Sequence, residues 1–165
     1  MNAKLKKRNG DMLIETLVGL SIVLIAITGI VSLISRAFSL NADTSNRFIA
    51  ANLSTEGLEL MKYYLVSDWN KVTSGVYEVN YKCDVFSPTC VNNLGTDLSL
   101  RSTKVLNVDA NGMYSYDAGT PTPFTRSVVV NWSGQSSEVA SVVSWTFKGD
   151  KKEIQLSEKL FRWHQ

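Results

Sequence analysis

An uncharged and mostly apolar run from Thr16 to Ser35 is the feature that most constrains this chain. In a helix, about 20 residues at roughly 1.5 Å each span the hydrocarbon core of a bilayer, which is about 30 Å thick. The run therefore predicts a transmembrane helix. Four cations lie between residues 4 and 8, whereas only Arg36 stands near the far end of the run. By the positive-inside rule, we expect the N-terminus in the cytoplasm and everything after Arg36 outside it.

A cleaved secretory signal peptide is the competing interpretation of the same residues. Its apolar region is usually about 7–15 residues long and is followed by a cleavage site of small residues. Here the apolar run is longer, and no Ala-x-Ala sequence occurs before Arg36. We therefore expect the apolar segment to stay on the protein as a single-pass anchor.

Glu15 stands directly before the apolar run. A carboxylate at the edge of a membrane span is unfavourable unless it is neutralised, solvated or paired, so its presence indicates a functional residue. The alternative is a carboxylate that only marks the headgroup boundary, where its cost is lower than at the bilayer centre. The residues alone leave both interpretations open.

The sequence Lys-Lys-Arg-Asn-Gly at 6–10, with Leu-Ile-Glu-Thr-Leu opening the apolar run at 13–17, resembles the class III leader of type IV pilins and type II secretion pseudopilins. The resemblance implies that a prepilin peptidase cuts between Gly10 and Asp11. It also implies that Glu15, then the fifth residue, meets the amino terminus of a neighbouring subunit during assembly. The family commonly begins with an N-methylated phenylalanine, so Asp11 leaves methylation open.

By this resemblance, the chain is a minor pilin or pseudopilin, which is a structural subunit of a type IV pilus or of a type II secretion-like filament. The implied partners are other pilin subunits, the prepilin peptidase, the inner-membrane assembly platform and membrane lipid. The small residues Gly19, Ala26 and Gly29 would allow helices to approach closely. Two alternatives stay open: a single-pass anchored extracytoplasmic binding module that does not polymerise, and an anchored hydrolase.

Charge and motifs argue against other classes of function. The chain has 17 Lys and Arg against 15 Asp and Glu, but four of the cations belong to the leader, so nucleic-acid binding is not predicted. We expect no enzyme, cofactor or metal site, since His164 is the only histidine and no nucleophile or phosphate-loop motif occurs. The tract 107–112 partly matches a calcium loop, but Ala118 stands where a glutamate is required, and a hairpin turn explains the same residues.

Four segments are expected along the chain: a cleaved basic leader over 1–10, a transmembrane and assembly helix over 11–37, an amphipathic helix over 38–67, and a β-sheet head domain over 68–165. Apolar and small residues recur at helical spacing between Arg36 and Trp69. These residues are Ile49, Ala50, Leu53, Gly57, Leu60, Met61 and Tyr64. The spacing predicts one helix from about Met12 to Leu65, with Glu56 and Glu59 on its solvated face.

After Trp69 the apolar pattern shifts toward a period of two, which predicts β-strands. The expected strands are 76–81, 105–108, 113–116, 125–132, 138–147 and 153–157. Lys148-Gly149-Asp150 is expected to close the last hairpin. Because no helix intervenes, the strands predict an antiparallel sheet packed on one long helix, an α+β fold. The resemblance to pilins implies the same fold. Residues 158–163 are compatible with an extension of the last strand or with a helical turn.

Cys83 and Cys90 are separated by six residues. On an oxidising extracytoplasmic side they predict a short disulfide-closed loop, with two reduced thiols as the alternative.

Aromatic residues are the remaining candidates for a binding role. They are Trp69, Tyr77, Tyr81, Tyr114, Tyr116, Trp132, Trp145 and Trp163. We expect them to pack against the helix or to cover one face of the sheet, with a sugar- or ligand-binding platform as the alternative.

Overall fold

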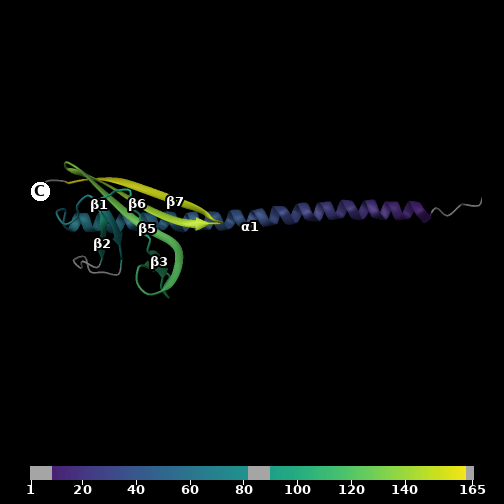
Figure 1. Cartoon of the computed structure of the whole chain (residues 1–165), viewed down its shortest axis with the longest axis horizontal. Coiled ribbons are helices and arrows are strands. Elements are labelled where there is room, and N and C mark those ends of the chain that lie inside the picture. Colours follow the sequence, from purple (N-terminus) through teal and green to yellow (C-terminus); the bar gives the residue numbers. More distant parts are fainter. Residues whose placement is uncertain (1–8, 82–89, 163–165) are drawn as a thin grey trace, which may run out of the picture. The chain divides into compact units, whose positions relative to one another are not determined.

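The structure, a computed structural model, describes residues 9–81 and 90–162. Its elements are α1 (Asn9–Ser67), β1 (Gly75–Val79), β2 (Val91–Gly95), β3 (Val105–Val108), β4 (Tyr114–Ser115), β5 (Thr120–Ser133), β6 (Ser136–Phe147) and β7 (Asp150–Phe161) (Figure 1). The chain divides into two compact units. The first unit ends at Thr44 and holds the N-terminal part of α1; the second, which we call the head unit, begins at Ser45 and holds the rest of α1 and every described strand.

The single helix predicted between Met12 and Leu65 is confirmed. No proline interrupts it, and the weak helix formers between residues 41 and 46 stay helical, although the boundary between the two units falls among them. At the end of the helix, one side chain satisfies a backbone carbonyl of the last turn and another closes the turn that follows. The hydroxyl of Ser67 donates to the carbonyl of Tyr64 at 2.8 Å, and the Asp68 carboxylate accepts the backbone N–H of Asn70 at 3.0 Å.

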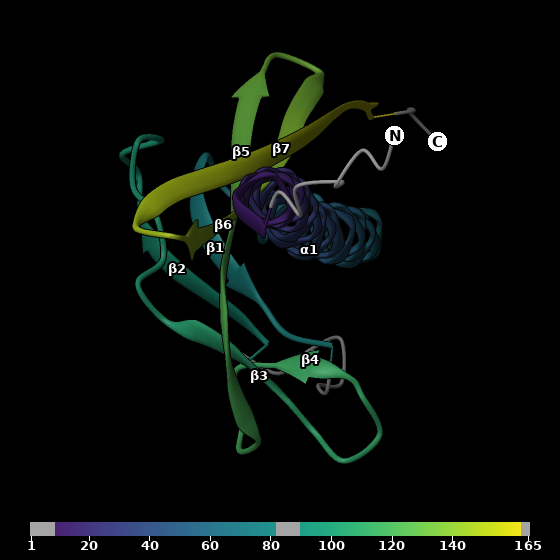
Figure 2. The ribbon, with the colours of Figure 1, turned by 90° about the vertical axis from the view of Figure 1, so that its right-hand side faces the viewer.

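The strands form one antiparallel sheet that curves past one side of α1 within the head unit (Figure 2). β5 is its organising strand. Along one edge, the first part of β5 pairs with β3, from Val108 opposite Thr120, and the later part pairs with β1, from Gly75 opposite Val130. Its other edge pairs with β6, which in turn pairs with β7. The α+β class predicted from the sequence, a long helix on an antiparallel sheet, is therefore confirmed.

Two hairpins confirm the expected turns. Lys148 and Gly149 connect β6 to β7, and both have positive φ values, 53° and 89°, as a two-residue hairpin loop requires. Between β3 and β4, the carboxylate Oδ1 of Asp109 accepts the backbone N–H groups of Asn111 and Met113, at 2.9 and 3.0 Å. Asp109 thus uses its carboxylate to close a turn.

The described strands differ from the expected bounds by a few residues at most ends, and three differences are larger. β2 was not expected, since Val91–Gly95 is mostly polar and does not alternate. β5 begins at Thr120 rather than 125 despite Pro121 and Pro123. There β5 pairs only with β3, because its register with β6 begins at Thr125, and a proline without an N–H is tolerated on an open edge. The last strand continues to Phe161, which settles the choice left open after residue 157.

One face of the helix supplies the centre of the head core. The face is formed by the buried residues Ala50, Leu53, Ser54, Gly57, Met61 and Leu65. Toward the end of α1 it packs on valines of β1, β5 and β6, and nearer Ser45 it packs on Leu106, Phe124 and Trp145. At Gly57 the two layers come so close that a Cβ would collide with the Ser141 hydroxyl and lie 3.0 Å from Cδ of Arg126. Four residues of the stripe predicted from the sequence lie on this face, whereas its other members, Ile49, Leu60 and Tyr64, are half-buried.

Arg126 of β5 is a fully buried cation between helix and sheet. Its Nη1 donates to the carbonyl of Leu53 at 3.2 Å and its Nη2 to that of Val79 at 2.8 Å. The counter-ion is Glu56, whose Oε1 lies 3.1 Å from Nη1. The expectation that Glu56 lies on a solvated face is therefore wrong. Glu56 turns toward the sheet because a buried guanidinium needs a nearby anion. Glu59 is exposed, as expected.

Candidate functional site

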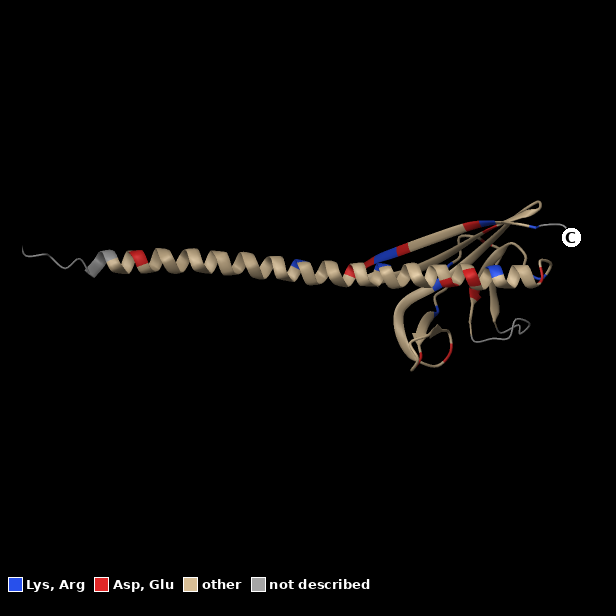
Figure 3. Ribbon diagram, turned by 180° about the vertical axis from the view of Figure 1, so that it is seen from behind, with Lys and Arg blue, Asp and Glu red and all other residues tan. Residues whose placement is uncertain are grey.

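The first unit presents a helix whose apolar side chains are exposed. Leu13 and Ile25 each expose 71% of their surface, and none of the most apolar stretch is buried. Figure 3 shows how sparse the charged residues are in this part of the helix. By length and composition, this helix is able to cross a membrane. Apolar surface of this extent requires a cover of lipid or of other protein.

Hydroxyl groups within the apolar stretch are satisfied by the helix itself. Thr16, Ser21, Thr28 and Ser35 each donate to a carbonyl three or four residues earlier, at 2.7 to 3.0 Å. Such internal bonds remove the cost of placing a hydroxyl in hydrocarbon. Glu15 is the charged residue in the stretch between Met12 and Ser35.

The helix brings the predicted assembly residues to one face. At about 100° per residue, Glu15, Gly19, Ala26 and Gly29 fall within an arc of about 80°. A Cβ built on Gly19 or Gly29 would meet nothing within 4 Å, so the surface there is low and open. Glu15 is itself exposed at the N-terminal end of this face. We call these four residues the small-residue face.

Two predicted residue pairs are only partly described. Gly10 and Asp11, the residues of the predicted cleavage site, lie within α1, but the surroundings of Gly10 and the side chain of Asp11 are outside the described part. Cys90 is fully buried next to β2, whereas Cys83 lies outside the described residues. The disulfide between them stays a prediction.

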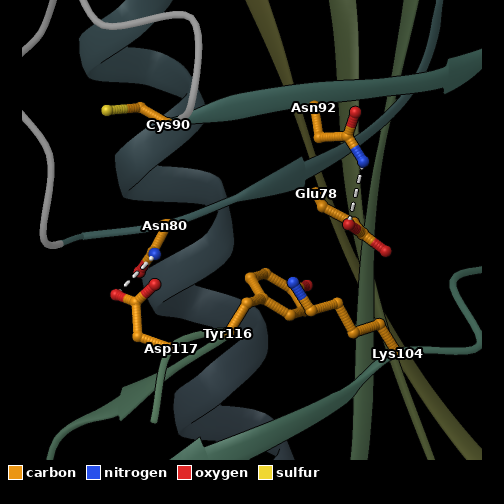
Figure 4. Close-up of a pocket in the computed structure, with 7 residues that line it drawn as sticks. All are labelled: Glu78, Asn80, Cys90, Asn92, Lys104, Tyr116 and Asp117. Carbon is orange, nitrogen blue, oxygen red and sulfur yellow. Dashed lines mark hydrogen bonds between the residues drawn. The ribbon is translucent and has the colours of Figure 1, made fainter.

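A polar cavity of about 350 Å³ lies in the head unit and is shown in Figure 4. Its lining residues are Glu78, Asn80, Cys90, Asn92, Lys104, Tyr116 and Asp117. The amide of Asn92 donates to Glu78 and that of Asn80 to Asp117, both at 3.1 Å. Each carboxylate thus has an amide partner inside the cavity. The described residues contain no group of three or more His, Cys, Asp or Glu that could hold a metal ion.

Tyr116 closes one side of this cavity. Burial raises the pKa of Tyr116 to about 12, against the opposing effect of the Arg126 guanidinium. The neutral hydroxyl donates to the carbonyl of Arg126 at 2.8 Å, and Lys104 Nζ lies 5.3 Å from the ring centroid. This geometry holds the phenol as a structural donor that ties the residue after β4 to β5.

The described aromatic residues lie in different surroundings. Tyr77, Tyr116 and Trp145 are buried, as the packing interpretation predicts. Trp69 and Trp132 are half-buried beside a second cavity at the end of the helix, which the sequence did not distinguish from core packing. Tyr81 and Tyr114 are half-buried away from this cavity. Trp163 lies outside the described residues.

No family model, curated protein or solved structure matches this chain. The features that bear on function are therefore the leader-like sequence at residues 6–17 and the small-residue face.

Proposed function

We propose that this protein is a structural subunit, a minor pilin or pseudopilin, of a type IV pilus or type II secretion-like filament. The observation that carries the proposal is Glu15 on the same helix face as Gly19, Ala26 and Gly29. The leader-like sequence at residues 6–17 and the α+β head unit support it.

In this proposal the subunit resides in the bilayer before assembly. The apolar helix lies in the membrane with its N-terminus in the cytoplasm and the head unit outside. Cleavage after Gly10 by the prepilin peptidase leaves a new amino group on Asp11, close to Glu15 in the chain. The inner-membrane platform then transfers the helix from lipid to a bundle of like helices, and the filament becomes extracellular.

Glu15 would set the register of neighbouring subunits. Apolar helix surfaces slide past one another at little cost, whereas a pair of unit charges 4 Å apart gains about 4 kcal/mol at an effective dielectric constant of about 20. The carboxylate left unpaired in the bundle would be costly. The low surface at Gly19 and Gly29 would let a neighbouring helix approach closely enough to form the pair.

Processing is tested by intact-mass measurement and N-terminal sequencing of the full chain after co-expression with a prepilin peptidase. We expect a chain that begins at Asp11, and an uncleaved Gly10→Ala control. An added mass of about 14 Da, one methyl group, would show N-methylation. A wild-type chain that keeps residues 1–10 beside an active peptidase would refute the filament subunit and favour an anchored, non-polymerising binding module.

Assembly is tested separately with Glu15→Gln, which keeps the shape of the side chain and removes its charge. We expect this variant to be cleaved and membrane-inserted but absent from sheared filaments. Glu59→Gln is the matched control, because Glu59 is an exposed carboxylate of the same helix. Equal incorporation of both variants would contradict the role assigned to Glu15.

A further inference from the structure

A second cavity, of about 520 Å³, opens in the head unit where α1 ends. Three segments line it: the loop that follows α1, the end of β5 together with the β5–β6 turn, and the residue that follows β7. The lining residues that matter for binding are Trp69, Asn70, Trp132, Gln135 and Arg162. We call this cavity the tryptophan cleft. Its volume falls in the range of about 300–1,000 Å³ typical of small-molecule sites.

Two indole rings form the apolar wall of the cleft. Trp69 and Trp132 meet edge to face, with centroids 5.6 Å apart and ring planes inclined by 64°. Trp132 is fixed at both ends. Its ring Nε1–H donates to the carbonyl of Val72 at 2.8 Å, and its backbone N–H donates to the hydroxyl of Ser74 at 3.0 Å. A ring held in this way loses little conformational entropy when a ligand stacks on it.

The other lining groups are polar, and one of them is charged. Asn70 and Gln135 are exposed amide side chains, and Arg162 is the charged lining residue among the described ones. The backbone N–H of Arg162 donates to the carbonyl of Gln135 at 2.9 Å, which fastens the end of β7 to the β5–β6 turn. No carboxylate belongs to the described lining. The cleft thus offers an aromatic face, two amides and a guanidinium.

We propose that the tryptophan cleft binds a saccharide that carries a carboxylate, such as a uronic or sialic acid. The C–H face of a pyranose ring is weakly positive and fits the negative face of an indole. Asn70 and Gln135 each supply a donor and an acceptor, which is the combination that vicinal hydroxyls require. The planar guanidinium of Arg162 binds a carboxylate through two parallel hydrogen bonds.

A nucleotide is the main competing ligand, since bases also stack on tryptophan and phosphate also binds arginine. The saccharide is favoured because the two indoles meet at an angle rather than as a parallel slot for a flat base. This binding activity goes beyond the role of a filament subunit, and it does not depend on cleavage or polymerisation.

Ligand-observed saturation-transfer NMR on the full chain in phosphatidylcholine nanodiscs tests the proposal, because sugar-headed detergents would compete. The acidic probes are glucuronate, galacturonate and N-acetylneuraminate; the comparison ligands are glucose, galactose, acetate and AMP. We expect at least one acidic sugar to bind with a Kd of about 1 mM, a strength typical of small ligands. Its neutral counterpart and acetate should bind at least about tenfold more weakly, because the neutral sugar lacks the carboxylate and acetate lacks the sugar ring.

Arg162→Ala and Gln135→Ala are the test variants, since both side chains are exposed and their removal spares the core. We expect Arg162→Ala to abolish the preference for the acidic sugar over its neutral counterpart and Gln135→Ala to weaken both. Arg101→Ala is the matched control, because Arg101 is an arginine outside the cleft, 3.9 Å from Glu153. Unchanged near-ultraviolet circular dichroism shows that each variant is folded.

Three results would overturn the proposal. They are no binding by any of the three acidic sugars, binding of AMP or acetate as tight as that of the best sugar, and an Arg162→Ala variant that binds like Arg101→Ala. A failure of Gly10 cleavage would leave the proposal standing, so the two functions are tested independently.

Discussion

Gly57→Ala should destabilise the head unit even though it improves the helix. Alanine is favoured over glycine within a helix by about 1 kcal/mol. Against this gain, the new Cβ would collide with the Ser141 hydroxyl and lie 3.0 Å from Cδ of Arg126, and overpacking of this kind costs about 1–3 kcal/mol. We therefore expect a net loss of about 1 kcal/mol in the free energy of unfolding.

The cause is isolated by Ser141→Ala. The Ser141 hydroxyl is buried and has no hydrogen-bond partner in the described structure, so its removal should cost little by itself. In the double variant with Gly57→Ala, most of the collision disappears, and the helix gain should restore stability to about the wild-type level. The expected interaction energy between the two changes is therefore about 1 kcal/mol.

Urea unfolding of the full chain in detergent, followed by tryptophan emission, measures these effects, since all four tryptophans lie after Ser45. Thr55→Ala is the control for helix propensity, because Thr55 is exposed on the same helix. It should stabilise by a few tenths of a kcal/mol. If Gly57→Ala is as stabilising as this control, or if Ser141→Ala does not reduce its cost, the close approach of helix and sheet is refuted.

Three further predictions concern the head unit. The pKa of Tyr116 is raised to about 12, so the stability that its neutral phenol gives the folded state is complete below the unfolded pKa of about 10 and is lost as pH rises through 12. The loss amounts to about 2–3 kcal/mol in the free energy of unfolding. Tyr116→Phe should remove this alkaline loss, as measured by urea unfolding at a series of pH values. Glu56→Gln should lower the free energy of unfolding, because it removes the counter-ion of buried Arg126. The expected loss is only about 1–2 kcal/mol, since Glu56 is partly exposed and solvent screens the pair. Thermal unfolding at low and high salt measures this loss. Asp109→Ala should cost about 1 kcal/mol and speed amide exchange at the β3–β4 turn, because two backbone donors lose their acceptor.

The helix and the hairpin turns were predictable because local chemistry decides them. An unbroken stripe of apolar and small residues specifies α1, and Lys148-Gly149 suits a two-residue loop whatever surrounds it. β2 was not predictable, since its polar residues become a strand only through pairing with β1. Its assignment depends on tertiary structure.

Arg126 shows a different limit of sequence reasoning. A lone arginine in a strand is expected to face solvent, yet Phe124, Val128 and Val130 lie on the same side by the period of two and are all buried. That alternation was a signal that Arg126 points inward. The counter-ion, Glu56, comes from a helix far away in sequence, and no local pattern reveals the pair.

For the small-residue face, helical periodicity alone places Glu15 beside Gly19, and the helix in the structure agrees. The tryptophan cleft, in contrast, could not be predicted from a local sequence pattern. Trp69 and Trp132 are separated by more than half of the head unit in sequence, and their meeting depends on where β5 ends relative to α1.

The position of β5 late in the chain has a consequence for biogenesis. β1 and β3 both dock on β5, and Ser54 of the helix bonds to Ser141, 87 residues later, so apart from β1 the strands that cover the apolar face of α1 are synthesised well after this face. A ribosome that adds about 5–20 residues per second leaves most of this face uncovered for several seconds. The nascent head therefore needs a chaperone or the membrane surface as a temporary cover, and a chain that stops before β6 should be degraded rather than stored.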